Sequence, residues 1–140
     1  MYNNQLVNSK QSGKAPFIGI RRHRLWSDGQ GVTTLVAFWG CPLRCRYCLN
    51  EQCHEEAGRM LLLSPRQLYE KVKLDNLYFR ATQGGITFGG GEPAMYANFI
   101  REFRELCGKA WHINMETSLN VRPGKFQMLL PVIIAILNNR

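Results

Sequence analysis

The sequence predicts an α/β fold built on parallel strands. Short apolar runs, rich in β-branched and aromatic residues, alternate along the chain with segments of helical periodicity. Glycines bound several of these runs, which favours buried strands over helices. Because helices follow strands in succession, the connections are expected to be right-handed crossovers between parallel strands. At 140 residues, 45% of them hydrophobic, the chain has the length and the apolar content of one domain.

Each element is expected from its residue pattern. Ser64 and Pro65 mark a helix start, with the serine as N-cap and the proline at the first helical position. Leu68, Val72, Leu74 and Leu77 would form the apolar face of that helix. The expected extended segments are residues 17–20, 33–39, 61–63, 86–88, 111–116 and 132–137, the expected helices are 65–80, 96–107 and 123–130, and loops are expected over 21–29 and 50–58.

The formal net charge is +8, but the excess is concentrated at the start of the chain. Residues 1–27 contain five basic residues and no acid, which leaves only +3 for the remainder. We expect residues 1–16 to be a flexible basic tail and residues 17–140 to form the domain. A solvated arm is a commoner outcome than a nucleic-acid site, so the charge argues weakly for RNA.

Three cysteines directly follow the apolar run 33–39 and Gly40. Cys41, Cys45 and Cys48 have the spacing C-x3-C-x2-C, which would place three thiols on a tight loop at a strand end. The odd number argues against a disulfide framework, and the five cysteines suggest reduced thiols in a cytoplasmic chain without a membrane span. Two interpretations stay open: a zinc site completed by Cys53 or His54, and an iron–sulfur cluster with one open iron.

A second motif lies at residues 84–93, which read Gly-Gly-Ile-Thr-Phe-Gly-Gly-Gly-Glu-Pro. Glycines at the end of a strand let the backbone approach a ligand closely, because no Cβ intervenes. Pro93 restricts Glu92 to an extended conformation and so limits where its carboxylate points. Alone, the triple glycine would be interpreted as a tight turn that carries an exposed glutamate.

Together the two motifs resemble the signature of the radical S-adenosylmethionine (SAM) superfamily. The run Arg46–Asn50, with Phe38, Trp39 and Gly40 before the first cysteine, is most similar to the activating enzymes of glycyl radical enzymes, the pyruvate formate-lyase activase type. The resemblance covers about residues 17–121. It implies a partial parallel (βα) barrel, of which about four strands are present. Truncation and a naturally minimal barrel, like that of the small anaerobic ribonucleotide reductase activases, both fit this length.

The resemblance implies the cofactors and their ligands. The metal ligands of a [4Fe–4S] cluster would be Cys41, Cys45 and Cys48. The open iron would bind S-adenosyl-L-methionine, whose reductive cleavage gives a 5′-deoxyadenosyl radical for hydrogen abstraction. Glu92 would contact the ammonium group of SAM, and no single catalytic side chain is indicated. The cofactor-binding residues that the resemblance implies are Tyr47, Gly90, Gly91, Glu92, Thr117 and Ser118.

The expected partners are a glycyl radical enzyme as protein substrate and a flavodoxin-like or ferredoxin-like electron donor. The alternatives are a zinc- or cluster-holding binding module, and a fragment that holds a cluster without turnover. Cys53 and His54 are expected to be an exposed or incidental pair, and Cys107 a buried thiol at a helix end. Tyr47 is expected either beside the adenine of SAM or packed within its loop. His23 has no expected partner.

Overall fold

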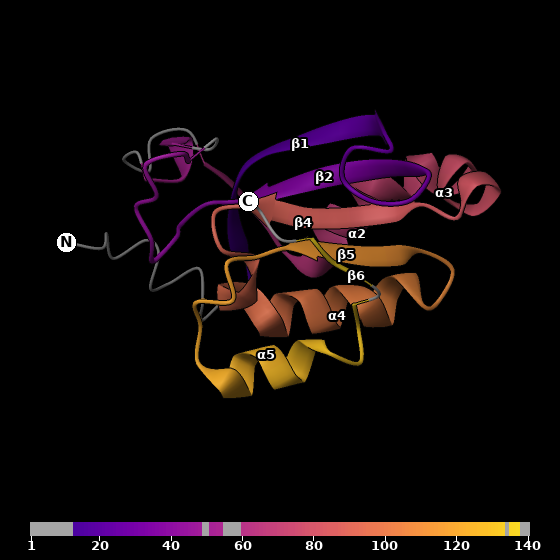
Figure 1. The fold of residues 1–140 in the computed structure, drawn as a ribbon. Coiled ribbons are helices and arrows are strands. Elements are labelled where there is room, and N and C mark those ends of the chain that lie inside the picture. Colours follow the sequence, from indigo (N-terminus) through magenta and orange to yellow (C-terminus); the bar gives the residue numbers. More distant parts are fainter. Residues whose placement is uncertain (1–12, 49–50, 55–59, 134, 138–140) are drawn as a thin grey trace.

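A computed structural model describes residues 13–48, 51–54, 60–133 and 135–137. Its centre is a six-stranded sheet with the order β3-β1-β2-β4-β5-β6 (Figure 1). The sheet is open, because β3 and β6 form its two edges. The strands are β1 Ala15–Leu25, β2 Val32–Phe38, β3 Leu61–Leu63, β4 Gly85–Gly90, β5 His112–Glu116 and β6 Ala135–Leu137.

Four of these strands are parallel, as the sequence predicts. In this set β2 pairs with β4, β4 with β5, and β5 with β6. The other two strands extend the sheet on the far side of β2, where β1 runs antiparallel to both β2 and β3. The α/β class and the four parallel strands of a partial barrel are therefore confirmed.

Helices cover one face of this sheet (Figure 1). The helical segments are α2 Pro65–Val72, α3 Asn76–Thr82, α4 Ala97–Cys107 and α5 Pro123–Leu129, with the 3₁₀ turns η1 Glu51–His54, η3 Lys73–Asp75 and η4 Pro93–Tyr96. Ser64 caps α2 as predicted, since its hydroxyl accepts from the Gln67 amide while the Gln67 side chain accepts from the Ser64 amide. No helix among the described residues is long and apolar enough to cross a membrane.

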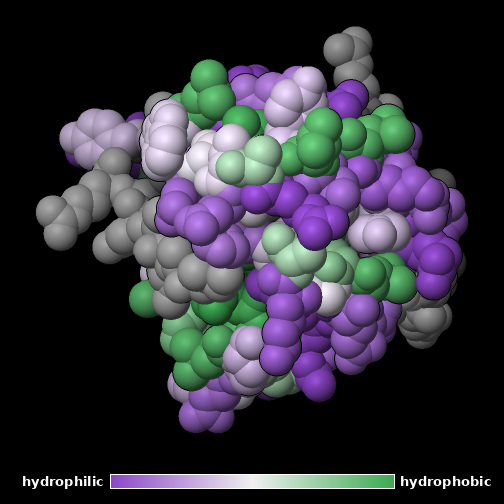
Figure 2. Space-filling view, turned by 90° about the vertical axis from the view of Figure 1, so that its right-hand side faces the viewer, coloured by the Kyte–Doolittle hydropathy of each residue, from purple (hydrophilic) through white to green (hydrophobic). Residues whose placement is uncertain are grey.

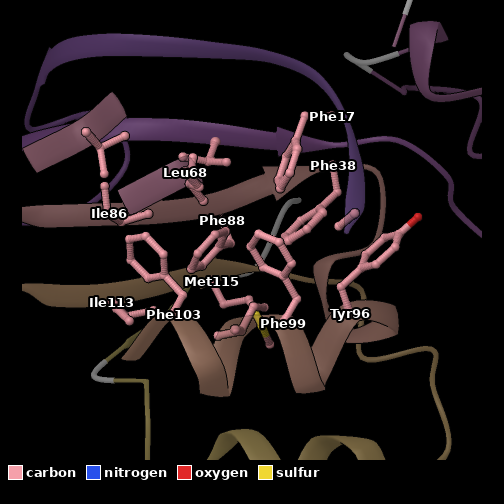
Figure 3. Packing of buried hydrophobic residues seen from close by; sticks show 14 of the residues in the cluster. Phe17, Phe38, Leu68, Ile86, Phe88, Tyr96, Phe99, Phe103, Ile113 and Met115 are labelled. Atoms are coloured by element: carbon pink, nitrogen blue, oxygen red, sulfur yellow. The ribbon is translucent and has the colours of Figure 1, made fainter. Parts of the chain in front are cut away.

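The core lies between the sheet and these helices, and Phe38 is at its centre. The Phe38 ring stacks on Tyr96 with ring centroids 4.5 Å apart and on Phe17 at 4.7 Å. Phe88 and Phe99 surround it at 5.4 and 5.8 Å (Figure 3). Offset and edge-on aromatic packing of this kind adds to the free energy of burial. Because Phe38 is the last residue of β2, this cluster fixes the point at which the cysteine loop begins.

The prediction of one helix over residues 65–80 is wrong. The helix breaks at η3, and α3 begins anew at Asn76. The predicted apolar face also fails, because Leu74 and Leu77 are 69% and 75% exposed, while Leu68 and Val72 are buried. Figure 2, which faces the α3 end of the molecule, shows hydrophobic side chains there interspersed with hydrophilic ones.

The break coincides with a buried carboxylate, Asp75. Its oxygens accept hydrogen bonds from Arg22 at 2.5 and 2.8 Å, and from the Thr34 hydroxyl at 3.2 Å. His23 Nε2 lies 2.9 Å from Asp75 Oδ1, so the expectation that His23 has no partner is also wrong. The hydrogen bonds from Arg22 and the nearby His23 hold the pKa of Asp75 below its usual range. The hydrogen bonds of Asp75 to distant residues, rather than the local helical periodicity, decide where the helix breaks.

The prediction that a loop begins at Arg21 is wrong, because β1 continues to Leu25. Arg21 to Leu25 continue β1, with a register shift between Arg21 and Arg24. The shift turns Arg22 and His23 out of the ladder and toward Asp75. β1 also starts at Ala15, so the last two residues of the predicted tail are part of the sheet, while residues 1–12 lie outside the described chain.

Replacing Asp75 by Asn should destabilise the fold at neutral pH. The change removes the buried charge that Arg22, His23 and Thr34 share, and we expect the free energy of unfolding to fall by about 2 kcal/mol. Glu70→Gln is the matched control, because Glu70 of α2 forms an exposed ion pair with Lys73 of η3 and its replacement should cost little stability. Urea unfolding of both variants measures the difference.

The same difference should depend on pH. A carboxylate whose pKa is lowered by folding stabilises the chain above its unfolded pKa, about 3.9, and this contribution is lost as the pH falls through the folded value. The gap between parent and Asp75→Asn should therefore be full near pH 7 and shrink below about pH 4. A gap of equal size at pH 3 and pH 7 would contradict the assigned role of the charge.

Candidate functional site

The predicted site residues gather at the carboxyl ends of β2, β4 and β5. The cysteine loop leaves β2 after Phe38, the glycine run ends β4 at Gly90, and Thr117 follows β5 (Figure 1). Parallel neighbours deliver their carboxyl ends to one edge of the sheet, and α/β proteins place their ligands at such edges. The order of the strands therefore brings together three motifs that are far apart in the sequence.

Backbone hydrogen bonds join the cysteine loop to the glycine motif. The Gly91 amide donates to the Phe38 carbonyl and the Glu92 amide donates to the Gly40 carbonyl, each at 2.8 Å. A Cβ on Gly91 would lie 2.1 Å from the Gly40 oxygen, which no side chain permits. Gly90 adopts a φ of +86°, in the region that favours glycine. The glycines thus allow the two loops to touch.

Further contacts fix the base of the cysteine loop. The Gly40 amide donates to the Cys53 carbonyl at 3.1 Å, so the chain returns to its starting point after the three predicted ligands. The Trp39 amide donates to Pro16 of β1 at 2.9 Å, and the Tyr96 hydroxyl donates to the Trp39 carbonyl at 2.6 Å. The loop is therefore anchored at both ends on the sheet.

The three predicted thiols lie on the part of the loop without regular structure. Cys41 and Cys48 are half-buried and Cys45 is exposed, with the Cys48 amide donating to the Cys45 carbonyl at 3.2 Å. Burial raises the pKa of Cys41, and the negative charge of Glu92 and the neighbouring thiols raise it further. Three thiols in one loop, with a carboxylate close by, suit the donor chemistry of an iron–sulfur cluster that keeps one iron open.

Glu92 is the centre of a buried network that includes two other predicted residues. Only 1% of Glu92 is exposed. Its Oε1 accepts from the Thr117 hydroxyl and from the Ala94 amide, and its Oε2 accepts from Ser118, from the amide at 2.9 Å and the hydroxyl at 2.6 Å. The chain's own donors thus use the four acceptor positions of the carboxylate. Glu92 ties the end of β4 to the loop after β5.

The face of the sheet turned away from the helices carries polar residues that the sequence analysis did not assign. Arg24 pairs with the buried Asp28, whose carbonyl accepts from the Thr87 hydroxyl at 2.5 Å. Asn114 Nδ2 donates to Thr87 in turn. The signal was present in the alternation of Thr87 with Phe88 and of Asn114 with Met115, which puts polar side chains on one face.

Glu116 ends this polar face next to the glycine motif. A Cβ on Gly89 would lie 2.8 Å from Glu116 Oε2, so the glycine leaves room for the carboxylate. Burial raises the pKa of Glu116, and the charge of Asp28 raises it further. Glu116 directly precedes Thr117 and Ser118, the two residues that the resemblance implies as cofactor-binding.

The remaining predicted residues have different surroundings. The Tyr47 side chain is 90% exposed, so packing within its loop does not hold it. Cys107 is half-buried at the last residue of α4 and packs against the core, close to the expectation. Asn50 lies outside the described residues.

Cys53 departs from its expected exposure. It belongs to η1 and is only 1% exposed, so an exposed pair with His54 is wrong. Burial, together with the nearby thiols of Cys48 and Cys41, raises the pKa of Cys53 to about 12. The ligand atoms of Cys48, Cys53 and His54 lie within 4.8 Å of one another. The sequence offered Cys53 or His54 only as a fourth ligand beside the three-cysteine motif. The grouping of both with Cys48 depends on the return of the loop to Gly40.

Comparison with known proteins shows the family of this chain. The chain matches the family model described as the radical SAM superfamily over residues 36–133. It is 39% identical over 80 residues to the pyruvate formate-lyase-activating enzyme of Clostridium pasteurianum, covering 57% of this chain and 33% of the relative. It is 29% identical over 160 aligned positions to the pyruvate formate-lyase 2-activating enzyme of Escherichia coli K12, covering 91% of this chain and 52% of the relative.

A solved structure has the same fold. The crystal structure of QueE from Escherichia coli superimposes with a TM-score of 0.59 at 14% identity, over 84% of this chain and 58% of that one. The chain spans about a third to a half of the length of the two activating enzymes. Members of the matched family use a [4Fe–4S] cluster and S-adenosylmethionine, which fits the thiols and the glycine motif described above. The chain belongs to the radical SAM superfamily.

Proposed function

We propose that this chain holds a [4Fe–4S] cluster through Cys41, Cys45 and Cys48 and binds SAM beside it. The observation that carries the proposal is the direct attachment of the cysteine loop to the glycine motif through Gly40 and Glu92. A simple metal-binding loop has no need of this attachment, whereas a cofactor that touches both motifs does. When bound, the reduced cluster and SAM supply a carbon-centred radical that abstracts a hydrogen atom from the substrate.

The chain's own residues would bind SAM, orient it and enclose it. Gly90 and Gly91 let the end of β4 pack directly against β2 and the start of the cysteine loop, because a Cβ at either residue would overlap Ala37 or the Gly40 carbonyl. The four acceptor positions of Glu92 are filled by the chain, so its carboxylate holds Thr117 and Ser118 at this edge and contributes only a nearby negative charge toward the ammonium group of SAM. Tyr47, exposed on the cysteine loop, is available to cover the adenine.

We propose a glycyl radical enzyme as the protein substrate. The support is the similarity of this chain to proteins named pyruvate formate-lyase-activating enzymes, 39% identical over 80 residues and 29% identical over 160 aligned positions. The electron donor in this proposal is a flavodoxin-like or ferredoxin-like protein, and the site of action is the cytoplasm.

Electron paramagnetic resonance of the anaerobically reconstituted and reduced chain tests the proposal. We expect a reduced [4Fe–4S] signal that shifts when SAM is added, and 5′-deoxyadenosine as a product. Cys45→Ser should lose the signal, whereas Cys107→Ser, on α4, should keep it. A signal that SAM shifts without any 5′-deoxyadenosine would identify a fragment that holds its cofactors but does not turn over. Failure to bind iron would exclude the proposal.

Replacing Gly91 by Ala should separate the two motifs. The added Cβ would overlap the Gly40 carbonyl, so the hydrogen bond from the Glu92 amide has to break or lengthen. We expect unfolding to become easier by about 2 kcal/mol and cluster loading to fall. Gly124→Ala on α5 is the matched control, because nothing lies within 4 Å of its added Cβ. Equal cluster content in the two variants would argue against a joined site.

Replacing Glu92 by Gln should loosen the loop after β5. The new amide group would face the Ser118 amide, donor against donor, at a cost of about 1–3 kcal/mol. Hydrogen exchange at Ser118 should become faster and SAM should bind more weakly, while the cluster still forms. Glu102→Gln, at an exposed position of α4, is the control. Unchanged exchange at Ser118 would contradict the assigned network.

A further inference from the structure

A compact group of thiol and imidazole side chains lies beside the proposed cluster ligands. The ligand atoms of Cys48, Cys53 and His54 are all within 4.8 Å of one another. In the part of the chain that the structure describes, no other group of three histidine, cysteine or carboxylate side chains is so close. Only Cys48 belongs to the three-cysteine motif, so the group is distinct from the proposed cluster ligand set.

A buried nitrogen atom without a partner is a second observation that points to a ligand. His54 Nε2 is buried and has no hydrogen-bond partner among the described residues. A buried polar atom without a partner costs free energy, and a metal ion bound at this nitrogen would remove that cost. Cys53 is almost fully buried as well, held there by the hydrogen bond from the Gly40 amide to its carbonyl. The closure of the loop on Gly40 thus holds Cys53, and His54 follows it directly in the same 3₁₀ turn.

The chemistry of these donors selects the metal. Thiolate sulfur and imidazole nitrogen suit zinc and disfavour magnesium and calcium, which take oxygen ligands. With zinc bonds of about 2.3 Å to sulfur and about 2.0 Å to nitrogen, tetrahedral ligands lie about 3.5–3.8 Å apart. Atoms that already lie within 4.8 Å of one another need to move by only about 1 Å to reach that geometry.

We propose that the cluster-free chain binds one Zn²⁺ through Cys48, Cys53 and His54, with solvent in the fourth position. Binding releases the thiol protons to the buffer and involves no change in oxidation state. Since Cys48 cannot serve both metals at once, zinc and the [4Fe–4S] cluster exclude each other. This exclusion rests on the proposed function, whereas the zinc site itself does not.

Anaerobic titration of the cluster-free full chain with Co²⁺, as a visible probe, and with Zn²⁺ in competition with a chromophoric chelator tests the site. We expect one metal per chain and the absorption of tetrahedral, thiolate-bound Co²⁺. His54→Ala should weaken zinc binding at least about tenfold. Cys45→Ser and Cys107→Ser should bind zinc like the parent. Loss of binding in Cys45→Ser but not in His54→Ala, or no binding in the parent, would overturn the proposal.

Cluster loading separates this inference from the proposed function. Zinc added before iron and sulfide should slow cluster formation in the parent but not in His54→Ala, and a chelator should restore it. If no variant forms a cluster while zinc still depends on His54, the proposed function fails and the zinc site stands. If His54→Ala forms the cluster no faster than the parent in zinc, the exclusion is wrong.

Discussion

Two backbone hydrogen bonds join the cysteine loop to the glycine motif, and the rest of the site depends on them. They run from Gly91 to Phe38 and from Glu92 to Gly40, and they hold the start of the cysteine loop against the end of β4. Both depend on glycine, because any side chain at residue 91 would occupy the space of the Gly40 carbonyl. The packing of Phe38 against Tyr96 and Phe17 fixes the strand end to which they attach. The packing of the hydrophobic core therefore also fixes the position of the site.

Glu92 extends that connection to a third strand. Its amide holds the cysteine loop, while its carboxylate holds Thr117 and Ser118 after β5. One residue thus sets the relative position of all three motifs. A buried carboxylate is costly unless its acceptor positions are filled, and here four donors of the chain fill them. The edge at which we propose that SAM binds is therefore formed by the chain's own contacts.

The sequence predicted those features that depend on local pattern. The parallel strands, the capped helix start at Ser64 and the thiols of the cysteine loop follow from periodicity, turn residues and spacing. It did not predict the features that depend on contacts between residues far apart in the sequence. The helix breaks because Asp75 binds Arg22 and His23, which lie more than fifty residues away in the sequence. Cys53 is buried because its carbonyl closes the loop on Gly40, and no local pattern reports that contact.

The most direct test of a single joined site is electron–nuclear double resonance of the reduced cluster with isotope-labelled SAM. We expect hyperfine coupling from the amino nitrogen and the carboxylate of SAM in the parent chain, and loss of that coupling in Gly91→Ala chains that still hold a cluster. An intact cluster without coupling in the parent would show that the cysteine loop and the glycine motif do not bind SAM together.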